Sequence, residues 1–470
     1  MMPVEQKPGF YLSAAHKSSG KTIVAVGICA ALRERGVAVR PFKKGPDYID
    51  PLWLTRAAHS PCINLDFNTQ SVSQIRAAFF SMAEDAAVSI IEGNKGLHDG
   101  MSVDGSDSNA ELAGLLNVPV ILVLDTQGTT RGIAPLIRGY QQFDPRVNIA
   151  GVILNKVAGP RHEEKLCANI RAHTDLEVMG SISRNQHLNI NERHIGLTPS
   201  NEIAHADTLI DRIRQVVGSC IDLDRLPGVP PYRQSRGVPA PATTYPASDV
   251  RIGIPRDRAF CFYYADDLES FRRHGARLEF FDTLEDETIP DHVEALFIGG
   301  GFPEVHMEAL QNNASMRHAI AAFVAEGGPV YAECGGLMYL GQSIRWQGRT
   351  AKMVGALPLD VEMEAKPVGR GYVRLEETGH SPWGRLNGSS SDIHAHEFHY
   401  SRIRLLEEQN EYAYRVKRGW GMDGKHDGLV YRNVLASYAH LRHVAPVCWV
   451  SRFMDFVRET RKTRQPARSI

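Results

Sequence analysis

Cysteine is scarce in this chain and scattered along it. Seven cysteines lie among 470 residues, and none forms a Cys-x-x-Cys pair with a neighbour. This spacing excludes a disulfide framework of the secreted type and gives no support for a structural zinc site. We therefore expect a protein of the reducing cytoplasm.

Excess charge and long apolar runs are also missing. The formal net charge is −1, from 53 Lys and Arg against 54 Asp and Glu, so no basic surplus favours nucleic acid or an anionic membrane. The longest apolar run, residues 118–124, is far shorter than the roughly 20 residues that cross a bilayer. The first residues lack the apolar region of a signal peptide. We expect no nucleic-acid or membrane partner, and a homodimer is left open.

The remaining composition is typical of a globular protein, with 43% hydrophobic and 23% charged residues. The length predicts two or three domains. Short apolar runs alternate with amphipathic stretches such as 22–35, which predicts right-handed βαβ units, mostly parallel sheets and an α/β fold. The expected strands are 10–14, 37–42, 88–91, 118–124 and 149–154, followed by 250–254, 278–281, 295–298 and 330–332.

Six prolines interrupt this pattern between residues 218 and 249. We interpret that stretch as an extended linker. The predicted organisation is then an α/β domain over 1–217, a linker over 218–249, a second α/β domain over 250–457, and a basic tail over 458–470. The tail is interpreted as a frayed terminus.

A phosphate-binding loop is predicted between the first strand and the helix after it. The segment 15–22 reads Ala-His-Lys-Ser-Ser-Gly-Lys-Thr. Backbone N–H groups and the helix N-terminus would receive phosphate oxygens, Lys21 would neutralise their charge, and Thr22 would bind Mg²⁺. Ala15 replaces the usual first glycine, so a solvated turn is the alternative. The candidate nucleotide-binding residues are Ser18, Ser19, Gly20, Lys21 and Thr22.

Acidic residues follow the next two strands, in segments 42–51 and 90–100. The carboxyl ends of parallel strands share one sheet edge with the phosphate loop. Asp47 and Glu92 are therefore expected to reach the same Mg²⁺ as Thr22, because this ion takes oxygen ligands beside the phosphates. Taken singly, each acid is better explained as a helix cap or loop carboxylate, but the three strand-end positions together favour the metal site.

Cys334 ends a short apolar run and is followed by two glycines and a helical pattern. This layout is typical of a nucleophile on a sharp strand-to-helix turn, the alternative being a buried structural thiol. Gly300 and Gly301 also end a strand, and with the Gly335 N–H they are candidates for an oxyanion hole. A thiol nucleophile and an ATP site in one chain point to a glutamine-dependent, amide-forming synthetase.

Segments 43–51, 92–100 and 191–197 resemble signature segments of the cobyrinic acid a,c-diamide synthase family. The likeness runs nearly end to end, apart from the linker and the tail. It implies a dethiobiotin-synthetase-like P-loop domain followed by a flavodoxin-like class I glutamine amidotransferase domain. It also implies Mg²⁺, ATP and glutamine, and metal-binding positions at Thr22, Asp47 and Glu92.

By the same resemblance, the acceptor is a modified tetrapyrrole whose a and c acetate carboxylates are amidated through acyl phosphates. Because an acyl phosphate hydrolyses in water, we expect both sites to be shielded and ammonia to pass internally between the domains. Cobyrinate is the expected acceptor. Lys95 and His98 depart from the usual pattern, so sirohaem or sirohydrochlorin amidation is kept as an alternative. A cobyric acid synthase and a non-catalytic P-loop switch ATPase are weaker alternatives. The candidate acceptor-binding residues are Tyr48, Asp50, Lys95, His98 and Asp99.

Segment 436–441 resembles the family's catalytic-histidine segment, which makes His440 the candidate base for Cys334. Arg442 stands where the family usually places a second histidine, and His443 follows it. Three more histidines lie at 394, 396 and 399. In a strand His394 and His396 share one face while His399 faces the other way, which favours a structural or acceptor-binding role over a metal site.

The segment that opens the second domain also matches the family. Arg256, Asp257 and residues 260–264 are candidates for the lining of an acceptor cleft. The aromatic run 260–264 fits a hydrophobic core equally well, and both interpretations stay open.

Overall fold

The computed structural model describes residues 8–184, 190, 192–193, 196–229, 245–384, 386 and 392–464. The chain forms two compact units, Met1–Ala242 and Thr243–Ile470. Each unit is built on a sheet with parallel strands, which confirms the predicted α/β class. Among the described residues no helix is long and apolar enough to cross a membrane.

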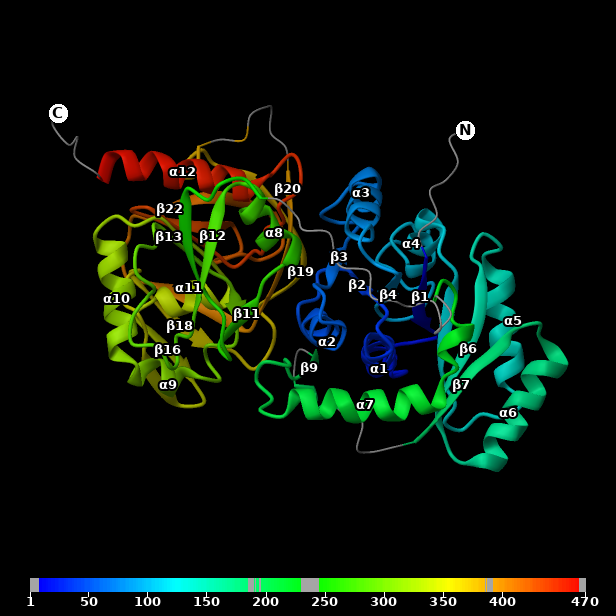
Figure 1. The fold of residues 1–470 in the computed structure, drawn as a ribbon. Helices are drawn as coiled ribbons and strands as arrows, with labels where there is room; N and C mark the ends of the chain where they lie inside the picture. The colour runs from blue at the N-terminus through cyan, green and yellow to red at the C-terminus, as the bar shows by residue number, and fades with distance from the viewer. Residues whose placement is uncertain are drawn as a thin grey trace. The chain divides into compact units, whose positions relative to one another are not determined.

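The first unit contains a seven-stranded sheet in the order β3-β2-β4-β1-β5-β6-β7. Figure 1 labels its helices and most of its strands. All neighbouring strands are parallel. The strands are β1 (Gly9–Ala14), β2 (Val39–Lys44), β3 (Ile63–Leu65), β4 (Val88–Glu92), β5 (Val120–Asp125), β6 (Ile149–Val157) and β7 (Glu177–Ser183). The sequence predicted five of them and missed β3 and β7.

Helices connect these strands and cover the sheet. They are α1 (Lys21–Glu34), α2 (Ile49–Ala58), α3 (Val72–Met82), α4 (Asn109–Leu116), α5 (Ile133–Phe143), α6 (Pro160–His173) and α7 (Ala206–Cys220). Every residue of β1 and β4 is buried, as expected for strands covered on both faces. Two short strands, β8 (Glu192–Arg193) and β9 (Gly196–Leu197), form a separate ribbon. The signature segment 191–197 lies partly outside the described residues.

Two predicted boundaries are wrong. Residues 218–220 belong to α7, Ile221 pairs with Gly180 beside β7, and a 3-10 turn, η2, follows at Leu223–Arg225. The prolines that signalled a linker lie further on, and residues 230–244 are outside the described part. The tail does not begin at 458 either, because α12 (Trp449–Arg464) continues through it and Arg458 pairs with Asp249.

The second unit has a nine-stranded sheet in the order β12-β10-β13-β15-β24-β23-β22-β19-β20. The strands from β12 to β24 are parallel, and those from β24 to β20 are antiparallel. Their bounds are β10 (Val250–Pro255), β12 (Ala276–Phe281), β13 (Ala295–Ile298), β15 (Val330–Glu333), β19 (Gly369–Glu377), β20 (Ile393–His399), β22 (Glu411–Arg418), β23 (His426–Tyr431) and β24 (Val434–Ser437). The four parallel strands before β24 were predicted, and the antiparallel extension was not.

Smaller elements complete this unit. A ribbon joins β11 (Phe260–Phe262) to β14 (Gly300–Gly301), and a four-stranded sheet contains β16 (Ser343–Trp346), β17 (Arg349–Lys352), β18 (Leu359–Met363) and β21 (Ser401–Leu405). The helices are α8 (Ala265–Arg273), α9 (Met307–Asn312), α10 (Ala314–Ala325), α11 (Gly335–Leu340) and α12.

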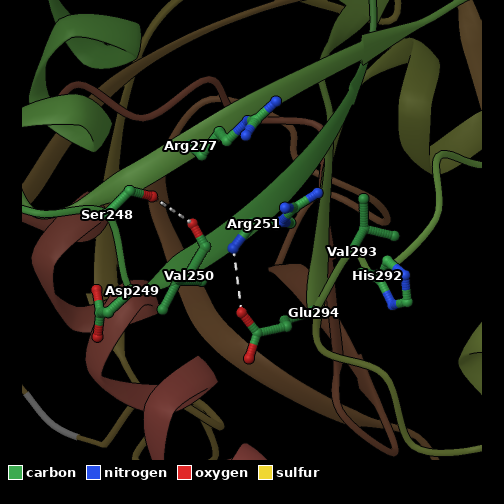
Figure 2. A pocket seen from close by; sticks show the side chains of 8 residues that line it. All are labelled: Ser248, Asp249, Val250, Arg251, Arg277, His292, Val293 and Glu294. Atoms are coloured by element: carbon green, nitrogen blue, oxygen red, sulfur yellow. Dashed lines mark hydrogen bonds between the residues drawn. The ribbon is translucent and has the colours of Figure 1, made fainter.

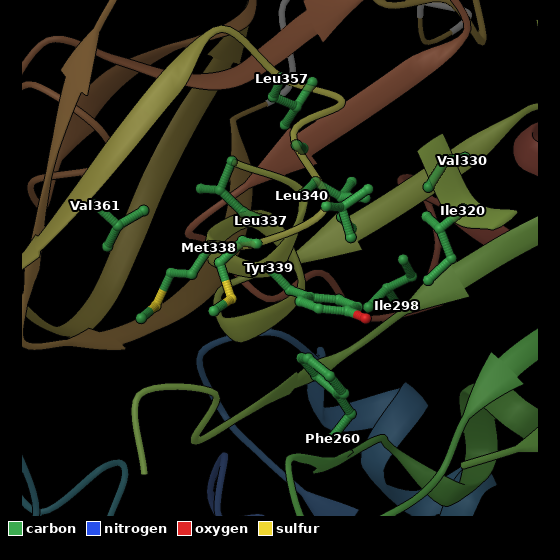
Figure 3. Packing of buried hydrophobic residues seen from close by; sticks show 14 of the residues in the cluster. Phe260, Ile298, Ile320, Val330, Leu337, Met338, Tyr339, Leu340, Leu357 and Val361 are labelled. Carbon is green, nitrogen blue, oxygen red and sulfur yellow. The ribbon is translucent and has the colours of Figure 1, made fainter. Parts of the chain in front are cut away.

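Helix α11 is embedded in the core of the second unit. All six of its residues are buried, and Tyr339 packs against Phe260 with ring centroids 5.2 Å apart (Figure 3). Leu337 and Leu340 are fully buried in the same cluster as Ile298 of β13. This packing holds the turn between β15 and α11 in a fixed position.

Candidate functional site

The loop between β1 and α1 has the backbone of a tight anion-binding turn. Gly20 has φ 86°, and a Cβ there would lie 2.2 Å from Asn155 Nδ2, so this position requires glycine. Asn155 Nδ2 donates to the Ser19 carbonyl at 2.8 Å, and Lys156 Nζ donates to the Ser18 carbonyl at 2.9 Å. The sequence reasoning missed both residues of β6, because no local motif marks them.

A buried cluster of acids and a lysine lies beside this loop. Thr22 Oγ1 donates to Glu92 Oε1 at 2.6 Å. Lys43 Nζ lies 2.6 Å from Asp50 Oδ2 and 3.1 Å from Glu92 Oε1. The sheet order explains why these side chains lie close together, because β1, β4 and β2 are successive neighbours whose carboxyl ends share one edge. Lys43 was not among the predicted site residues.

This cluster fits a magnesium ion that is shared with phosphates. Among the described residues no group of three or more His, Cys, Asp or Glu side chains could hold a metal by itself. Glu92 is 1% exposed, and its Oε2 has no hydrogen-bond partner in the described part of the chain. Mg²⁺ usually takes one or two carboxylates and completes its shell with phosphates and water. Thr22 and Glu92 meet that requirement.

Asp47 is placed differently from the prediction. Its Oδ1 accepts from the N–H groups of Ile49 and Asp50, at 2.9 and 3.1 Å, and so caps the first turn of α2. Its other oxygen lies 4.0 Å from Lys43 Nζ, and its side chain is 36% exposed. Asp47 therefore has one oxygen left over for a ligand, and its role at the metal stays a prediction.

Two buried lysines face the same edge. Lys21 Nζ donates to the Lys95 carbonyl at 2.7 Å, and Lys44 Nζ donates to Asn94 Oδ1 at 3.4 Å. Loss of hydration lowers the pKa of Lys21 to about 8, although Glu92 acts in the opposite direction. Loss of hydration likewise lowers the pKa of Lys44 to about 8. A bound anion would stabilise the charged form of both lysines, because it would compensate for the hydration that burial removes.

The candidate acceptor-binding residues divide into two groups. Tyr48 is buried at the start of α2, and Asp50 is bound to Lys43. Lys95 and Asp99 are exposed. Asn109, which the sequence reasoning missed, shapes this segment, since its amide donates to the carbonyls of Asn94 and Gly96.

His98 does not stand alone at the edge of the first sheet. Its ring stacks on Tyr140 of α5 at 5.5 Å between centroids and meets Phe143 edge-on at 4.7 Å. Loss of hydration lowers its pKa. These contacts give the histidine a packing role, and contact with an acceptor stays a prediction.

In the second unit, Cys334 occupies the sharp turn that the sequence predicted. It directly follows β15 and precedes α11, with φ 48° and ψ −102°, a conformation that side-chain-bearing residues rarely adopt. The thiol lies 3.8 Å from the Phe398 carbonyl, and the residue is 6% exposed. Strain held by a packed core is a feature of nucleophile turns.

The predicted oxyanion glycines gather around this turn. A Cβ on Gly335 would lie 2.9 Å from the Gly301 backbone nitrogen. A Cβ on Gly300 would lie 2.7 Å from Cε1 of His440. The three glycines thus line the space next to the nucleophile and its histidine, where only residues without side chains fit. That their backbone N–H groups donate hydrogen bonds to an oxyanion stays a prediction.

His440 is buried next to Cys334. Nδ1 of His440 lies 3.3 Å from Glu333 Oε2. Burial lowers the pKa of His440, but the hydrogen bonds and charges of Cys334 and Glu333 outweigh it and raise the pKa to about 10. These two neighbours therefore favour the protonated form of the imidazole. The sequence reasoning did not single out Glu333.

The neighbouring histidine and arginine at 443 and 442 have structural partners. Arg442 is 1% exposed and pairs with Asp266 Oδ2 at 2.5 Å. His443 Nδ1 accepts from the Val450 N–H at 3.0 Å, and loss of hydration lowers its pKa to about 4. His443 thus contacts the first turn of α12, whereas Arg442 pairs with the first turn of α8.

Strand β20 distributes its histidines as the strand geometry predicted. His394 is exposed, His396 faces the His440 ring at 6.3 Å between centroids, and His399 is buried. His399 stacks on Tyr438 at 3.7 Å and contacts the Ser401 carbonyl at 3.0 Å. The described residues contain no metal-binding group here.

The aromatic run at the start of the second unit is mainly core. Phe260 is 0% exposed, and Phe262 and Tyr264 are also buried. Asp257 accepts from Thr283 and from the N–H groups of Ala259 and Phe260. Asp257 is thus a structural brace, and Arg256 is exposed beside Phe280.

A cavity of about 520 Å³ in the second unit lies away from these groups. Figure 2 shows charged side chains around it, including Arg251, Arg277 and Glu294. It is lined by the start of β10, whereas Cys334 follows the end of β15, and both strands run parallel to β13 between them. The cavity is therefore at the opposite edge of the sheet from the nucleophile.

Comparison with known proteins finds one domain match for the unit with the loop at 15–22 and another for the unit with Cys334 and His440. Residues 251–445 match the CobB/CobQ-like glutamine amidotransferase domain, and residues 8–192 match an AAA domain. A cobyrinate a,c-diamide synthase of Magnetococcus marinus is 42% identical over 98% of this chain and 99% of its own. Proteins of that name from Caldanaerobacter subterraneus and Archaeoglobus fulgidus are 37% and 36% identical, each over 95% of this chain and 97% of theirs. The chain belongs to the cobyrinate a,c-diamide synthase family and is a glutamine-hydrolysing amide ligase.

Proposed function

We propose that this enzyme amidates the a and c acetate carboxylates of cobyrinate, with glutamine as the nitrogen source and ATP as the activating substrate. The main support for the proposal is the 36–42% identity to cobyrinate a,c-diamide synthases, which extends over nearly the full length of the chain. The clusters around Cys334 and Thr22 support it, because one suits release of ammonia and the other suits phosphoryl transfer. Family membership also removes the non-catalytic switch ATPase from consideration.

In the glutamine half, the Cys334 thiolate attacks the amide carbon of glutamine. The oxyanion that forms faces the N–H groups of the glycine turn, which stabilise developing charge. The His440 imidazolium gives its proton to the departing nitrogen, so that ammonia leaves and a thioester remains. Water, deprotonated by the now neutral His440, hydrolyses the thioester to glutamate and restores the thiol.

In the ATP half, an acceptor carboxylate oxygen attacks the γ-phosphorus, the bond to the β-phosphate oxygen breaks, and ADP leaves. Lys21 and the loop N–H groups hold the phosphates and offset the charge that develops on them. Mg²⁺ held by Thr22, Glu92 and Asp47 supplies further neutralisation when it is bound. Ammonia then attacks the acyl carbon, phosphate leaves, and one proton is lost to give the amide.

The acceptor is tested by mass spectrometry of the products. Cobyrinate, sirohydrochlorin and sirohaem are each incubated with the full-length enzyme, ATP, Mg²⁺ and glutamine. We expect one and then two amidations of cobyrinate, with the other two tetrapyrroles unchanged. Amidation of sirohaem or sirohydrochlorin but not of cobyrinate would overturn the proposed substrate while leaving the reaction class in place.

The pKa of Lys21 predicts a proton uptake on nucleotide binding. Because its pKa is lowered to about 8 by loss of hydration, the lysine is about half protonated at pH 8 in the free enzyme. Phosphate oxygens favour the charged form and raise this pKa, so binding takes up about half a proton at pH 8 and almost none at pH 6. Calorimetry of ATP binding in buffers of different ionisation enthalpy measures this number.

Lys44 also titrates near pH 8, so the proton uptake must be assigned to a residue. In a Lys21→Met variant we expect the uptake at pH 8 to fall. An unchanged uptake in that variant would contradict the placement of Lys21 against the phosphates.

A further inference from the structure

Glu333 occupies the position just before the nucleophile and is almost fully enclosed. Its side chain is 3% exposed, and Oε2 lies 3.3 Å from Nδ1 of His440. Its other oxygen, Oε1, accepts from the Tyr331 hydroxyl at 2.6 Å and from the Leu441 N–H at 2.9 Å. The Glu333 carboxylate therefore contacts both the His440 imidazole and the backbone N–H of the next residue, Leu441.

The geometry points to Glu333 as the positioning residue that orients His440 and stabilises its protonated form during glutamine hydrolysis. The two anchors on Oε1 fix the carboxylate, because Tyr331 lies two residues before it in the same strand and is itself 0% exposed. Oε2 is left to face Nδ1. The inference rests on the glutamine half of the proposed function.

The chemistry follows from the two distinct nitrogens of the ring. A proton on Nδ1 pairs with Glu333, which leaves Nε2 to accept the proton of the Cys334 thiol. The transfer converts a thiol and a neutral imidazole into a thiolate and an imidazolium, with no net change of charge. A fixed carboxylate next to the imidazolium favours the second state, in which sulfur is nucleophilic.

Other groups facing the imidazole do not offer this support. Cys334 and Glu333 approach His440 from the β15–α11 turn, and His396 approaches it from β20. Loss of hydration and the charge of His440 lower the pKa of His396 to about 3, so His396 stays neutral. Glu333 is then the carboxylate that faces the ring among these groups.

Asp427 provides a matched control on the adjoining strand. It is buried and accepts from Ser437 Oγ, the Tyr438 N–H and the Ala439 N–H, at 2.9, 3.0 and 2.9 Å. It thus braces the segment leading to His440 through the backbone and a hydroxyl and not through the imidazole. A merely structural carboxylate in this region should behave like Asp427.

The test compares Glu333→Gln with Asp427→Asn in the full-length enzyme. Glutamine keeps an oxygen for Tyr331 and Leu441 but presents an N–H₂ group to Nδ1, which opposes the required tautomer. We expect Glu333→Gln to lower kcat for glutamine hydrolysis by about 10²–10⁴-fold, while amidation supported by ammonium chloride is unchanged. Glu333→Asp should restore part of the loss.

A second readout separates orientation of the proton from loss of fold. Iodoacetamide labelling of the Cys334 peptide, followed by mass spectrometry as a function of pH, reports the thiolate. In Glu333→Gln we expect the labelling curve to move to higher pH, with at least about a tenfold slower rate at pH 7. Asp427→Asn should leave the curve in place. An unmoved curve in Glu333→Gln would overturn the inference.

The wild-type enzyme supplies a measurement that needs no folded Glu333 variant. In a sample with ¹⁵N-labelled histidine, the His440 signal is identified by its loss in His440→Asn, and we expect Nδ1 to carry a proton at pH 7. An unprotonated Nδ1 would refute the role of Glu333. If Cys334→Ala itself kept glutaminase activity, the glutamine half of the proposed function would fail instead.

Discussion

Replacing Cys334 with alanine is expected to abolish glutamine-dependent amidation, with kcat falling by about 10⁵-fold or more. In the proposed mechanism the covalent intermediate forms on this sulfur, and an alanine methyl group cannot form it. Ammonium chloride at high concentration should restore amidation to near the wild-type rate, because the groups around Thr22 are unaltered. Product formation with each nitrogen source measures both effects.

Replacement of Cys448 with alanine is the control for this experiment, since that thiol is only partly buried and lies next to α12. It should leave both nitrogen sources active. Full glutamine-dependent turnover in Cys334→Ala would show that the nucleophile has been assigned wrongly. Loss of the ammonium-dependent reaction as well would indicate damage beyond the thiol.

A Lys21→Met variant is expected to lose ATP-dependent amidation and to keep glutamine hydrolysis, the reverse of Cys334→Ala. Removing the ammonium group that we propose faces the phosphates should lower ammonium- and ATP-dependent amidation by about 10²–10³-fold, the usual effect of losing one preorganised charge. Glutamine hydrolysis should continue, because Cys334, His440 and Glu333 do not depend on this lysine. Initial rates of ADP release and of glutamate release measure the two halves separately.

Lys44→Met is a demanding control, because Lys44 is also buried and its pKa is also lowered to about 8. The Lys44 ammonium group donates to the side chain of Asn94, whereas the Lys21 ammonium group donates to the backbone carbonyl of Lys95. We expect a smaller loss than for Lys21→Met. Equal losses in the two variants would mean that general positive charge at this edge, and not a specific contact, supports phosphoryl transfer.

The parallel core of each unit could be predicted from the sequence because strands buried on both faces are continuous apolar runs. Val88–Glu92 and Val330–Glu333 are of this kind. The antiparallel strands were missed because their exposed faces are polar, as in Glu411–Arg418, where four of the eight residues are charged and only Ala413 and Tyr414 are buried. The tail was misjudged at Arg458 and Arg461, whose charges suggested solvent but pair with Asp249 and Glu294.

Local sequence was enough to locate the two turns, at 15–22 and at 333–336, because their glycines and neighbours are typical of such backbones. Tertiary structure alone decided which distant side chains complete each site. Glu333 reaches His440 because β15 pairs with β24, and Lys43 reaches Glu92 because β2 pairs with β4. Pairing between strands far apart in the chain brings these groups within hydrogen-bonding distance, and no local spacing records it.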